Sequence, residues 1–393
     1  MKILVASGSF KDVYSPVEAC SVIADALDRT KNEVVSVPFC DGGEYTMEVL
    51  KSRFPYESVE VKNIRNAYGE QITGEYLINR DPTGDEAHII SSCILRLYPE
   101  EDRRKNPLLL SDYGFGQLIA DALDRGCRKF VLYFGGTSTA SCGMGTFQAL
   151  GGRLLDSAGE EIRVPCTGAD LIKIAEIIPP EKRLKDISVH IIGDGDSKVD
   201  ALPGITGLKV GKTFETEKEN IVRACMDGVE NVLRLTGISP EYHFTGAAGG
   251  LLFGLEQIFS GISYTLGGLY FKDILGIEEK IKACDLVITG EGRYDNTADG
   301  KAPSVIAGLA KKHRKPCILV CGQIEKKAVR CYSGGVISCE AEPAFSAQGI
   351  RTVLTAQEFY DSAELPQSYS ESVAFYRKET PIQLKSLFRK VGY

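Results

Sequence analysis

Segments with strand and helix patterns alternate along the chain, and this order constrains its fold more than any other feature. Residues 2–7 have the apolar pattern of a strand and residues 16–29 that of a helix, and residues 33–39 predict a second strand. Near the other end, the apolar runs at 285–289 and 316–322 flank a helical segment. This β-α-β order is typical of a parallel sheet covered by helices. Both chain ends therefore predict one parallel α/β domain.

The middle of the chain follows a different pattern. Residues 57–80 predict two alternating strands joined by a turn, and apolar strands recur at 129–134 and 187–192. At 393 residues the chain is also longer than one ordinary domain. We therefore predict two domains, one formed by residues 1–63 and 265–393 and a second α/β domain, residues 64–264, inserted between them.

Composition and charge argue against several classes of function. The net charge of −7 disfavours nucleic acid as a partner, because phosphate binding needs a basic face. No segment has the length and apolar character of a membrane span, and no signal-peptide pattern precedes the first strand. The twelve cysteines include no CxxC pair and the four histidines no HExxH spacing. We therefore expect a cytoplasmic enzyme with reduced cysteines, no histidine metal site, and neither nucleic-acid nor membrane partners.

Four loops that follow apolar runs carry the residue types of an anion site. They are the loop with Ser7, Gly8, Ser9 and Lys11, "CDGGEYT" at 40–46, "FGGTSTASCGMG" at 134–145, and "TGEGRYDNTADGKAP" at 289–303. Open α/β sheets bind ligands beyond the carboxyl ends of their strands, so these loops together predict a ligand cleft. Taken singly, each loop also fits an ordinary turn, a helix N-cap or a solvated lysine. Their glycines, hydroxyls and carboxylates suit phosphoryl transfer, which depends on positioning and charge neutralisation.

Taken in order, the motifs of the chain resemble the glycerate kinase family of the type I fold. They are "SFK" (9–11), "DGGE" (41–44), "GG-x-x-T" (135–139) followed by "QALGG" (148–152), "GAAGGLLFGL" (246–255) and "DLVITGEGRYD…GKAP" (285–303). That family phosphorylates D-glycerate with ATP and magnesium. The resemblance implies a Rossmann-like domain formed by both chain ends, an inserted α/β domain and an active-site cleft between them. It also implies an ATP-dependent kinase that uses Mg²⁺ and acts on a small hydroxy acid, and a homodimer is one assembly that it allows.

The resemblance further implies roles for residues of these loops. Lys11 would neutralise an anion, Asp41 or Glu44 would bind a substrate hydroxyl or act as general base, and Arg293 would face the γ-phosphoryl group. The implied catalytic residues are Lys11, Asp41, Glu44 and Asp194; the substrate-binding residues are Ser9, Arg293 and Asp295; the nucleotide-binding residues are Gly135, Gly136, Thr137, Ser138 and Thr139; and the metal ligands are Asp194, Asp196 and Glu291.

Several motif positions depart from the family pattern. The family's "DGGEGT" is "DGGEYT" here, so Tyr45 replaces a glycine, and Asp12 stands where a glycine usually follows the lysine. The family's "GGSATNDGG" becomes "GGTSTASCG", which places Ala140 and Ser141 at its Asn and Asp. Gly8 replaces a further Asp. Two family carboxylates are therefore missing from a site that needs to position a metal ion and phosphates.

These departures leave alternatives open. If the chain is a working glycerate kinase, another acid fills the missing role, and Asp194 or Asp196 is the best candidate. A kinase of a different small hydroxy acid or polyol is the second hypothesis, with Tyr45 shaping the pocket. A non-catalytic paralogue that binds a hydroxy acid or a nucleotide is the third. The sequence does not distinguish 2-phosphoglycerate from 3-phosphoglycerate as the product.

Overall fold

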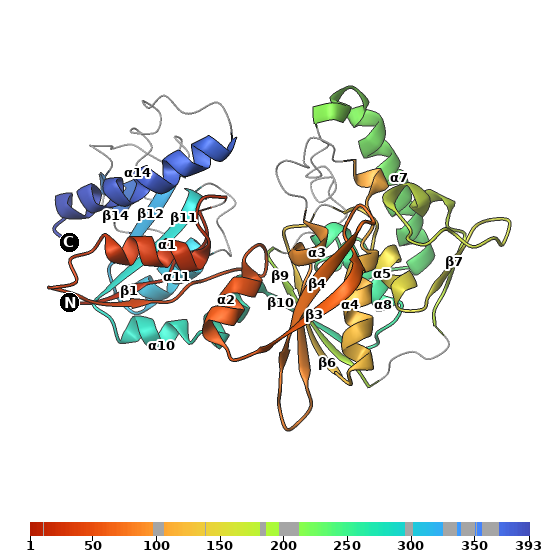
Figure 1. Cartoon of the computed structure of the whole chain (residues 1–393), viewed down its shortest axis with the longest axis horizontal. Helices are drawn as coiled ribbons and strands as arrows, with labels where there is room; N and C mark the ends of the chain where they lie inside the picture. Colours follow the sequence, from red (N-terminus) through yellow and green to blue (C-terminus); the bar gives the residue numbers. More distant parts are fainter. Residues whose placement is uncertain are drawn as a thin grey trace. The chain divides into compact units, whose positions relative to one another are not determined.

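A computed structural model of the chain forms two compact units (Figure 1). The structure describes residues 1–10, 12–96, 106–137, 139–180, 186–195, 212–294, 302–324, 336–338, 350, 352–355 and 369–393. The terminal unit contains Met1–Asp41, Glu48–Arg53 and Gly267–Tyr393. The inserted unit contains Gly42–Met47 and Phe54–Leu266.

The terminal unit is built on a six-stranded sheet with the order β13-β14-β12-β11-β1-β2. The strands are β1 (Lys2–Val5), β2 (Glu33–Ser36), β11 (Leu286–Tyr294), β12 (Cys317–Ile324), β13 (Val336–Ser338) and β14 (Thr352–Thr355). β13 pairs antiparallel with β14, and the other pairings are parallel. Ile3 lies opposite Leu286 in the central pair, so both ends of the chain form one sheet. The predicted fold class, a parallel-sheet domain made by both chain ends, is confirmed.

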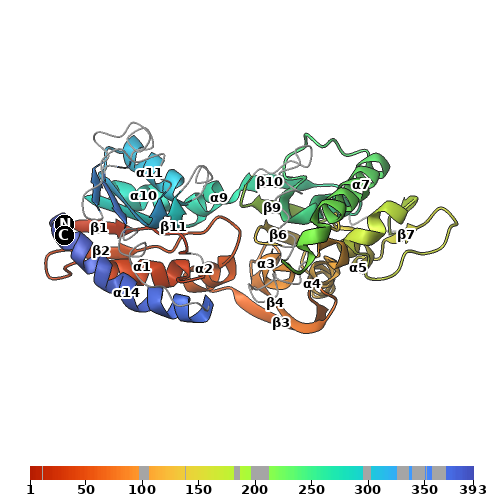
Figure 2. The ribbon, with the colours of Figure 1, turned by 90° about the horizontal axis from the view of Figure 1, so that it is seen from above.

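Helices cover both faces of this sheet. Figure 2 shows α1 (Pro16–Asp25) and α14 (Tyr369–Lys390) on one face and α10 (Ile277–Lys282) and α11 (Ala302–Lys312) on the other. The helix α9 (Gly267–Ile274) opens the second segment of the unit. α1 begins at a capping box, in which Ser15 Oγ accepts from the Glu18 amide while the Glu18 carboxylate accepts from the Ser15 amide. The predicted helix 16–29 thus begins as expected and ends early, at Asp25.

The inserted unit contains a second six-stranded sheet with the order β10-β9-β6-β5-β4-β3. Its strands are β3 (Glu57–Arg65), β4 (Gln71–Asn79), β5 (Glu86–Ile90), β6 (Lys129–Phe134), β9 (Ser188–Gly193) and β10 (Ile262–Leu266), and β7 (Arg153–Leu155) pairs separately with β8 (Glu176–Ile178). β5, β6, β9 and β10 are parallel, whereas β3, β4 and β5 pair antiparallel. The compact units divide at 53/54 and 266/267, with Gly42–Met47 also in the inserted unit, whereas the sequence predicts domain boundaries at 63/64 and 264/265. β3 pairs with β4 along its length, and β10 with β9 up to Leu266, so both whole strands belong here.

One face of the second sheet packs against a layer of helices. The helices are α3 (Ser92–Leu95), α4 (Tyr113–Asp124), α5 (Met144–Ala149), α7 (Lys218–Thr236) and α8 (Leu251–Glu256), with 3-10 turns at Pro107–Leu109, Gly168–Lys173, Lys212–Glu217 and Ala247–Gly249. Alternate residues of β6, namely Phe130, Leu132 and Phe134, enter this core, as the period of two in a strand requires. The helix α2 (Thr46–Arg53) is divided between the two units. In the described part of the chain, every helix is too short or too polar to cross a membrane.

Candidate functional site

Three parallel strands of the inserted unit end beside one another and are tied together there. Ser91 follows β5, Gly135 follows β6, and Asp194 follows β9. Ser91 Oγ lies 3.3 Å from both the nitrogen and the oxygen of Gly135, and the Asp194 amide donates to Phe134 O at 3.1 Å. The loops after these strands are therefore fixed to each other at the sheet edge where α/β proteins bind ligands.

Two glycines allow the segment Gly42–Met47 to approach these loops closely. A Cβ atom on Gly135 would lie 2.6 Å from Gly43 Cα and 2.8 Å from Asp194 Oδ2. A Cβ atom on Gly136, whose φ is +64°, would lie 2.9 Å from Glu44 Cγ. All three distances are shorter than real Cβ contacts, so only glycine fits at these two positions without a shift of its neighbours. The structure thus brings together the predicted site residues Glu44, Gly135, Gly136 and Asp194.

The Glu44 carboxylate has a cationic partner that sequence reasoning missed. Arg96 Nε lies 3.4 Å from Glu44 Oε1, and the two side chains are only 18% and 20% exposed. The neighbouring Gly43 carbonyl accepts from Thr46 Oγ1 at 2.8 Å and from Ser92 Oγ at 3.5 Å. These contacts hold the "DGGE" motif in place. Nothing in the sequence around Arg96 signals its role, because its partner lies 52 positions earlier in the chain.

The motif "GAAGGLLFGL" supports the segment 139–146 by backbone contact. A Cβ atom on Gly249 would lie 2.0 Å from Thr139 O, and one on Gly254 would lie 2.0 Å from Gly143 O. No other residue type permits such an approach. The side chain of Thr139 is 1% exposed, and its hydroxyl has no hydrogen-bond partner among the described residues. The motif therefore fixes the far end of the loop that begins at Gly135.

A buried carboxylate holds the same segment from the other side. Asp112 is fully buried and accepts hydrogen bonds from Ser141 Oγ at 2.5 Å, from the Gly143 amide at 2.9 Å and from the Thr146 amide at 2.5 Å. Burial raises the pKa of the Asp112 carboxyl, and these hydrogen bonds offset part of that rise. Ser141 is itself fully buried. It therefore faces a carboxylate inside the unit.

Asp112 is the second residue that sequence reasoning missed. It directly precedes α4, where an aspartate has an ordinary explanation as an N-cap. In the structure it makes no side-chain capping bond to α4. We expected Asp194 or Asp196 to replace the missing carboxylate at Ser141. The acid that contacts Ser141 is Asp112.

Three of the departures from the glycine pattern share one backbone conformation. Asp12, Tyr45 and Cys142 have φ values of +64°, +66° and +52°. In the patterns "DGGEGT" and "GGSATNDGG", Tyr45 and Cys142 stand at glycines, and Asp12 follows the lysine where a glycine is usual. Left-handed conformations cost a residue with a side chain roughly 1–2 kcal/mol. At each of these three positions, the backbone adopts a conformation that glycine would adopt more easily.

In the terminal unit, the loops after β1 and β11 are joined by backbone hydrogen bonds. The Gly8 amide donates to Gly290 O at 3.0 Å, and the Gly292 amide donates to Ser9 O at 3.2 Å. A Cβ atom on Gly290 would lie 2.6 Å from Ser7 Oγ, so the two loops approach as closely as glycine allows. The predicted residue Ser9 therefore lies beside the end of β11.

The remaining predicted residues of the terminal unit occupy two places. Glu291 and Arg293 are two positions apart on β11 and thus share a face, Glu291 partly buried and Arg293 exposed. Asp41 lies near the start of α9, since a Cβ atom on Gly267 would lie 1.6 Å from Asp41 O. Lys11, Ser138, Asp196 and Asp295 lie outside the described residues. The cleft between the two domains stays a prediction.

Among the described residues, no three His, Cys, Asp or Glu side chains lie close enough together to hold a metal ion. Mg²⁺ usually keeps several waters and binds through one or two carboxylates together with substrate phosphates. A single exposed carboxylate, Asp194, beside the Gly135 backbone fits that chemistry.

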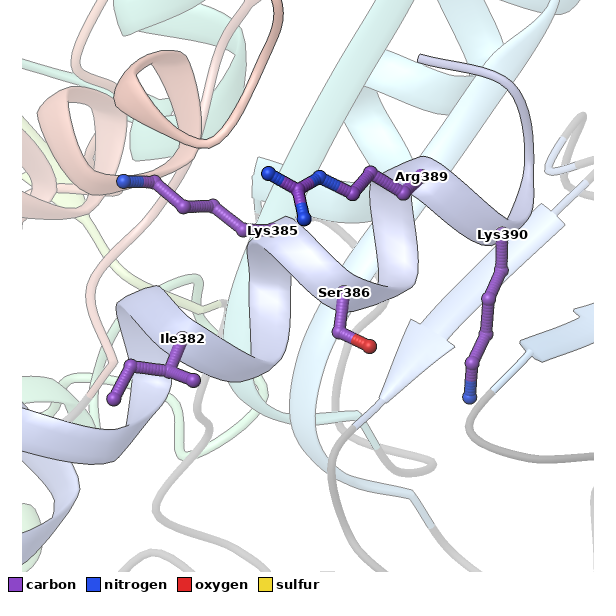
Figure 3. A pocket seen from close by; sticks show the side chains of 5 residues that line it. All are labelled: Ile382, Lys385, Ser386, Arg389 and Lys390. Carbon is purple, nitrogen blue, oxygen red and sulfur yellow. The ribbon is translucent and has the colours of Figure 1, made fainter.

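A separate cavity of about 560 Å³ lies on the outer side of α14 (Figure 3). It is lined by Ile382, Lys385, Ser386, Arg389 and Lys390. None of these residues was predicted for the site, and all belong to one helix near the chain end. We assign this cavity no function.

Comparisons with known proteins give a consistent result. Residues 3–341 match the sequence model of the glycerate kinase family. A glycerate kinase of Bacillus subtilis (strain 168) is 30% identical over 354 residues, which cover 86% of this chain and 88% of the relative. A glycerate 2-kinase of Escherichia coli (strain K12) is 29% identical over 337 residues, covering 82% and 86%. A crystal structure of a Salmonella typhimurium LT2 protein, described as a glycerate kinase 2, has the same fold, with a TM-score of 0.70 at 23% identity and coverage of 100% and 98%.

Proposed function

The chain belongs to the glycerate kinase family, and from this membership we propose that it transfers the γ-phosphoryl group of ATP to a hydroxyl of D-glycerate. The observation that carries the proposal is the meeting of Glu44, the Gly135-Gly136 backbone and Asp194 at the carboxyl ends of three parallel strands. Phosphoryl transfer needs an anion cradle, a carboxylate for the metal and a group that faces the accepting hydroxyl. The residue types of this constellation suit all three tasks.

The segment 135–139 is proposed to bind the phosphates of ATP. Gly135 and Gly136 have no side chains, so a phosphate oxygen can approach their backbone amides. Thr137 and Ser138 add hydroxyls, and the buried Thr139 hydroxyl, which lacks a partner among the described residues, adds a further donor. Such oriented donors stabilise charge on a transferring phosphoryl group because they need no reorganisation during the reaction.

Asp194 is proposed as the main Mg²⁺ ligand, with Asp196 and Glu291 as further candidates. When bound, Mg²⁺ would neutralise charge on the phosphates of ATP. The position of Asp194 Oδ2 at the Gly135 backbone supports this role, because a carboxylate there lies beside the proposed phosphate cradle.

Glu44 is proposed to face the accepting hydroxyl, either as its hydrogen-bond acceptor or as the general base. Arg96 supports this role because its Nε lies 3.4 Å from Glu44 Oε1, so a cation faces that oxygen of the carboxylate. Asp41 is the alternative base. Lys11, Ser9, Arg293 and Asp295 stay proposed ligands of the substrate carboxylate or of the transferred group.

The test is a panel of small hydroxy acids, including D-glycerate, in an ADP-release assay. We expect Glu44→Gln and Asp194→Asn to lower kcat/KM for glycerate by about 100-fold or more, the scale of lost general-base catalysis or metal binding. Asp121→Asn is the matched control, because this α4 carboxylate bonds Tyr76 and Arg125 outside the site. Turnover of another hydroxy acid alone would support the second kinase hypothesis. ATP binding without any turnover would support the non-catalytic one.

We further propose the 2-hydroxyl of glycerate as the acceptor, because the Escherichia coli relative is named a glycerate 2-kinase. Phosphorus NMR of the product distinguishes 2-phosphoglycerate from its 3-isomer directly. The homodimer and the cytoplasmic location stay predictions from the sequence, and light scattering of the purified protein tests the first.

A further inference from the structure

A carboxylate and a hydroxyl meet where the segment 139–146 departs from its family pattern. The pattern "GGSATNDGG" carries an aspartate at position 141, whereas this chain has Ser141. Ser141 Oγ donates to Asp112 Oδ2 at 2.5 Å, and both residues are fully buried. The segment 139–146 contains no acidic residue of its own. The carboxylate that reaches it belongs to Asp112, which directly precedes α4.

The hydrogen bonds of Asp112 show what this carboxylate does. α5 begins at Met144, and its N-cap, Gly143, has no side chain to accept from the first amides of the helix. Asp112 accepts from the Gly143 and Thr146 amides instead, and its backbone carbonyl accepts from Thr146 Oγ1 at 2.9 Å. A Cβ atom on Gly145 would lie 3.0 Å from Asp112 Oδ1, so the Asp112 carboxylate also lies close to the backbone at Gly145. Asp112 thus fixes the turn that leads into α5.

We propose that Asp112 provides the carboxylate that the family pattern carries at position 141. The carboxylate and the hydroxyl can exchange places between positions 112 and 141, and their hydrogen bond positions the nucleotide-binding segment, residues 135–139. Because Ser141 Oγ lies 2.5 Å from Asp112 Oδ2, one carboxylate fits in this contact, whether position 112 or position 141 carries it. Two carboxylates do not, because like charges in a buried site repel each other. Asp112 is a positioning residue, since it acts through the segment and touches no reacting group.

The proposal rests on the proposed function in one respect, the assignment of residues 135–139 to nucleotide binding. Thr139 lies only two residues before Ser141, and its carbonyl oxygen packs closely against the backbone of Gly249. Movement of Ser141 would therefore move the Thr139 hydroxyl. Small displacements of groups that position a substrate cost large factors in rate.

The test is a double-mutant cycle with Asp112→Ser, Ser141→Asp and the variant that carries both changes. The readouts are KM for ATP, kcat with glycerate, ADP affinity by calorimetry and Tm. We expect each single change to weaken ADP binding and raise KM for ATP by about 10- to 100-fold, the range for a hydrogen bond to a charged group. We expect the double change to restore both to within about threefold of the original protein, because one carboxylate again fills the contact.

Asp170→Asn is the matched control. Asp170 is also a buried carboxylate, and it accepts from Arg163, Lys173 and Thr167 in a turn that precedes β8. Its substitution is expected to lower Tm while KM for ATP stays within about twofold, since its partners lie outside the segment 139–146. If Asp112→Ser, like Asp170→Asn, lowered Tm and left nucleotide affinity unchanged, Asp112 would be a purely structural residue. That result would overturn the proposal.

The remaining outcomes separate this proposal from the proposed function. If the original protein turns over no glycerate, the proposed reaction fails, and the calorimetric cycle with ADP still decides the pairing. If the double variant binds ADP no better than the worse single variant, positions 112 and 141 cannot exchange the carboxylate, and the proposal is wrong. Should the double variant fail to fold, Asp112→Asn replaces it: this variant keeps the shape of the side chain and loses its charge. ADP affinity equal to that of the original protein would then overturn the proposal.

Discussion

Tyr45 and Cys142 hold, in two different loops, a backbone conformation that glycine adopts freely. Their φ values of +66° and +52° lie in the left-handed region, and both replace glycines of the family pattern. Residues in such conformations are retained only when the surrounding structure determines them strongly, and they concentrate at functional sites. Here the neighbours of Tyr45 are Glu44 and Thr46, which pair with Arg96 and with Gly43 O. The strain is therefore located within the candidate site.

Tyr45→Gly should leave the free energy of unfolding unchanged or raise it by up to about 1.5 kcal/mol. Removal of left-handed strain gains roughly 1–2 kcal/mol, and the greater chain entropy of glycine takes back about 0.5–1 kcal/mol. Tyr270→Gly, in the helix α9, is the control and should lower the free energy of unfolding by about 1 kcal/mol or more. Urea unfolding measures both. A loss larger than about 1 kcal/mol for Tyr45→Gly would mean that packing of the tyrosine ring outweighs the strain.

At the scale of elements, the two supports of the segment 139–146 are the 3-10 turn with α8 on one side and the start of α4 on the other. α8 supports the segment through Gly254. This glycine has no side chain, so the backbone of α8 contacts Gly143 O directly. The residue directly before α4, Asp112, contributes a carboxylate. The loop is thus positioned by regular elements of the inserted unit, and such elements hold a site more exactly than loops do.

Gly254→Ala should weaken this support. The added Cβ would lie 2.0 Å from Gly143 O, a backbone atom that cannot turn aside, so α8 and the loop have to separate. We expect a lower Tm together with a KM for ATP raised about tenfold or more. Gly308→Ala in α11 is the control, because a Cβ there meets nothing within 4 Å. Alanine in a helix interior should stabilise that variant by about 1 kcal/mol with unchanged kinetics. Equal Tm values for the two variants would contradict the contact.

The strands and most helices could be predicted from local patterns, because short apolar runs and helical periods are properties of neighbouring residues. The assignment of β3 could not, since its hydrogen bonds are made with β4 after a turn and the pattern does not say which sheet the hairpin joins. The glycines of the site were visible in the sequence. Arg96 and Asp112 were not, because each acts on a residue far away in the chain and resembles an ordinary surface cation or N-cap.

At the scale of the whole molecule, the terminal unit is assembled from segments at opposite ends of the sequence. Its core combines β1 and α1 with β11, β12, β14 and α14. From α14, the residues Leu384, Leu387 and Phe388 enter that core, while Ile382 points outward and is 55% exposed (Figure 3). The last helix is therefore part of the unit and closes one face of its sheet.

Phe388→Ala should destabilise the terminal unit by about 3–5 kcal/mol, the usual cost of removing a buried phenylalanine. Ile382→Ala on the outer face of the same helix is the matched control, with an expected change below about 0.5 kcal/mol. Denaturant unfolding followed by circular dichroism measures both. Similar values for the two variants would show that α14 does not pack against the sheet as described.

The pairing of β1 with β11 also sets the order in which this protein can fold during its synthesis. Lys2 and Asp285, which share a backbone-to-carboxylate hydrogen bond, are 283 residues apart. At a translation rate of roughly 5–20 residues per second, the first strand leaves the ribosome on the order of 15 to 60 seconds before its central partner exists. Every strand of the inserted unit's six-stranded sheet is synthesised within that interval. The nascent chain thus carries an apolar strand without a complete sheet for most of its synthesis, and the last strand of the inserted unit is made before β11, the central partner of β1.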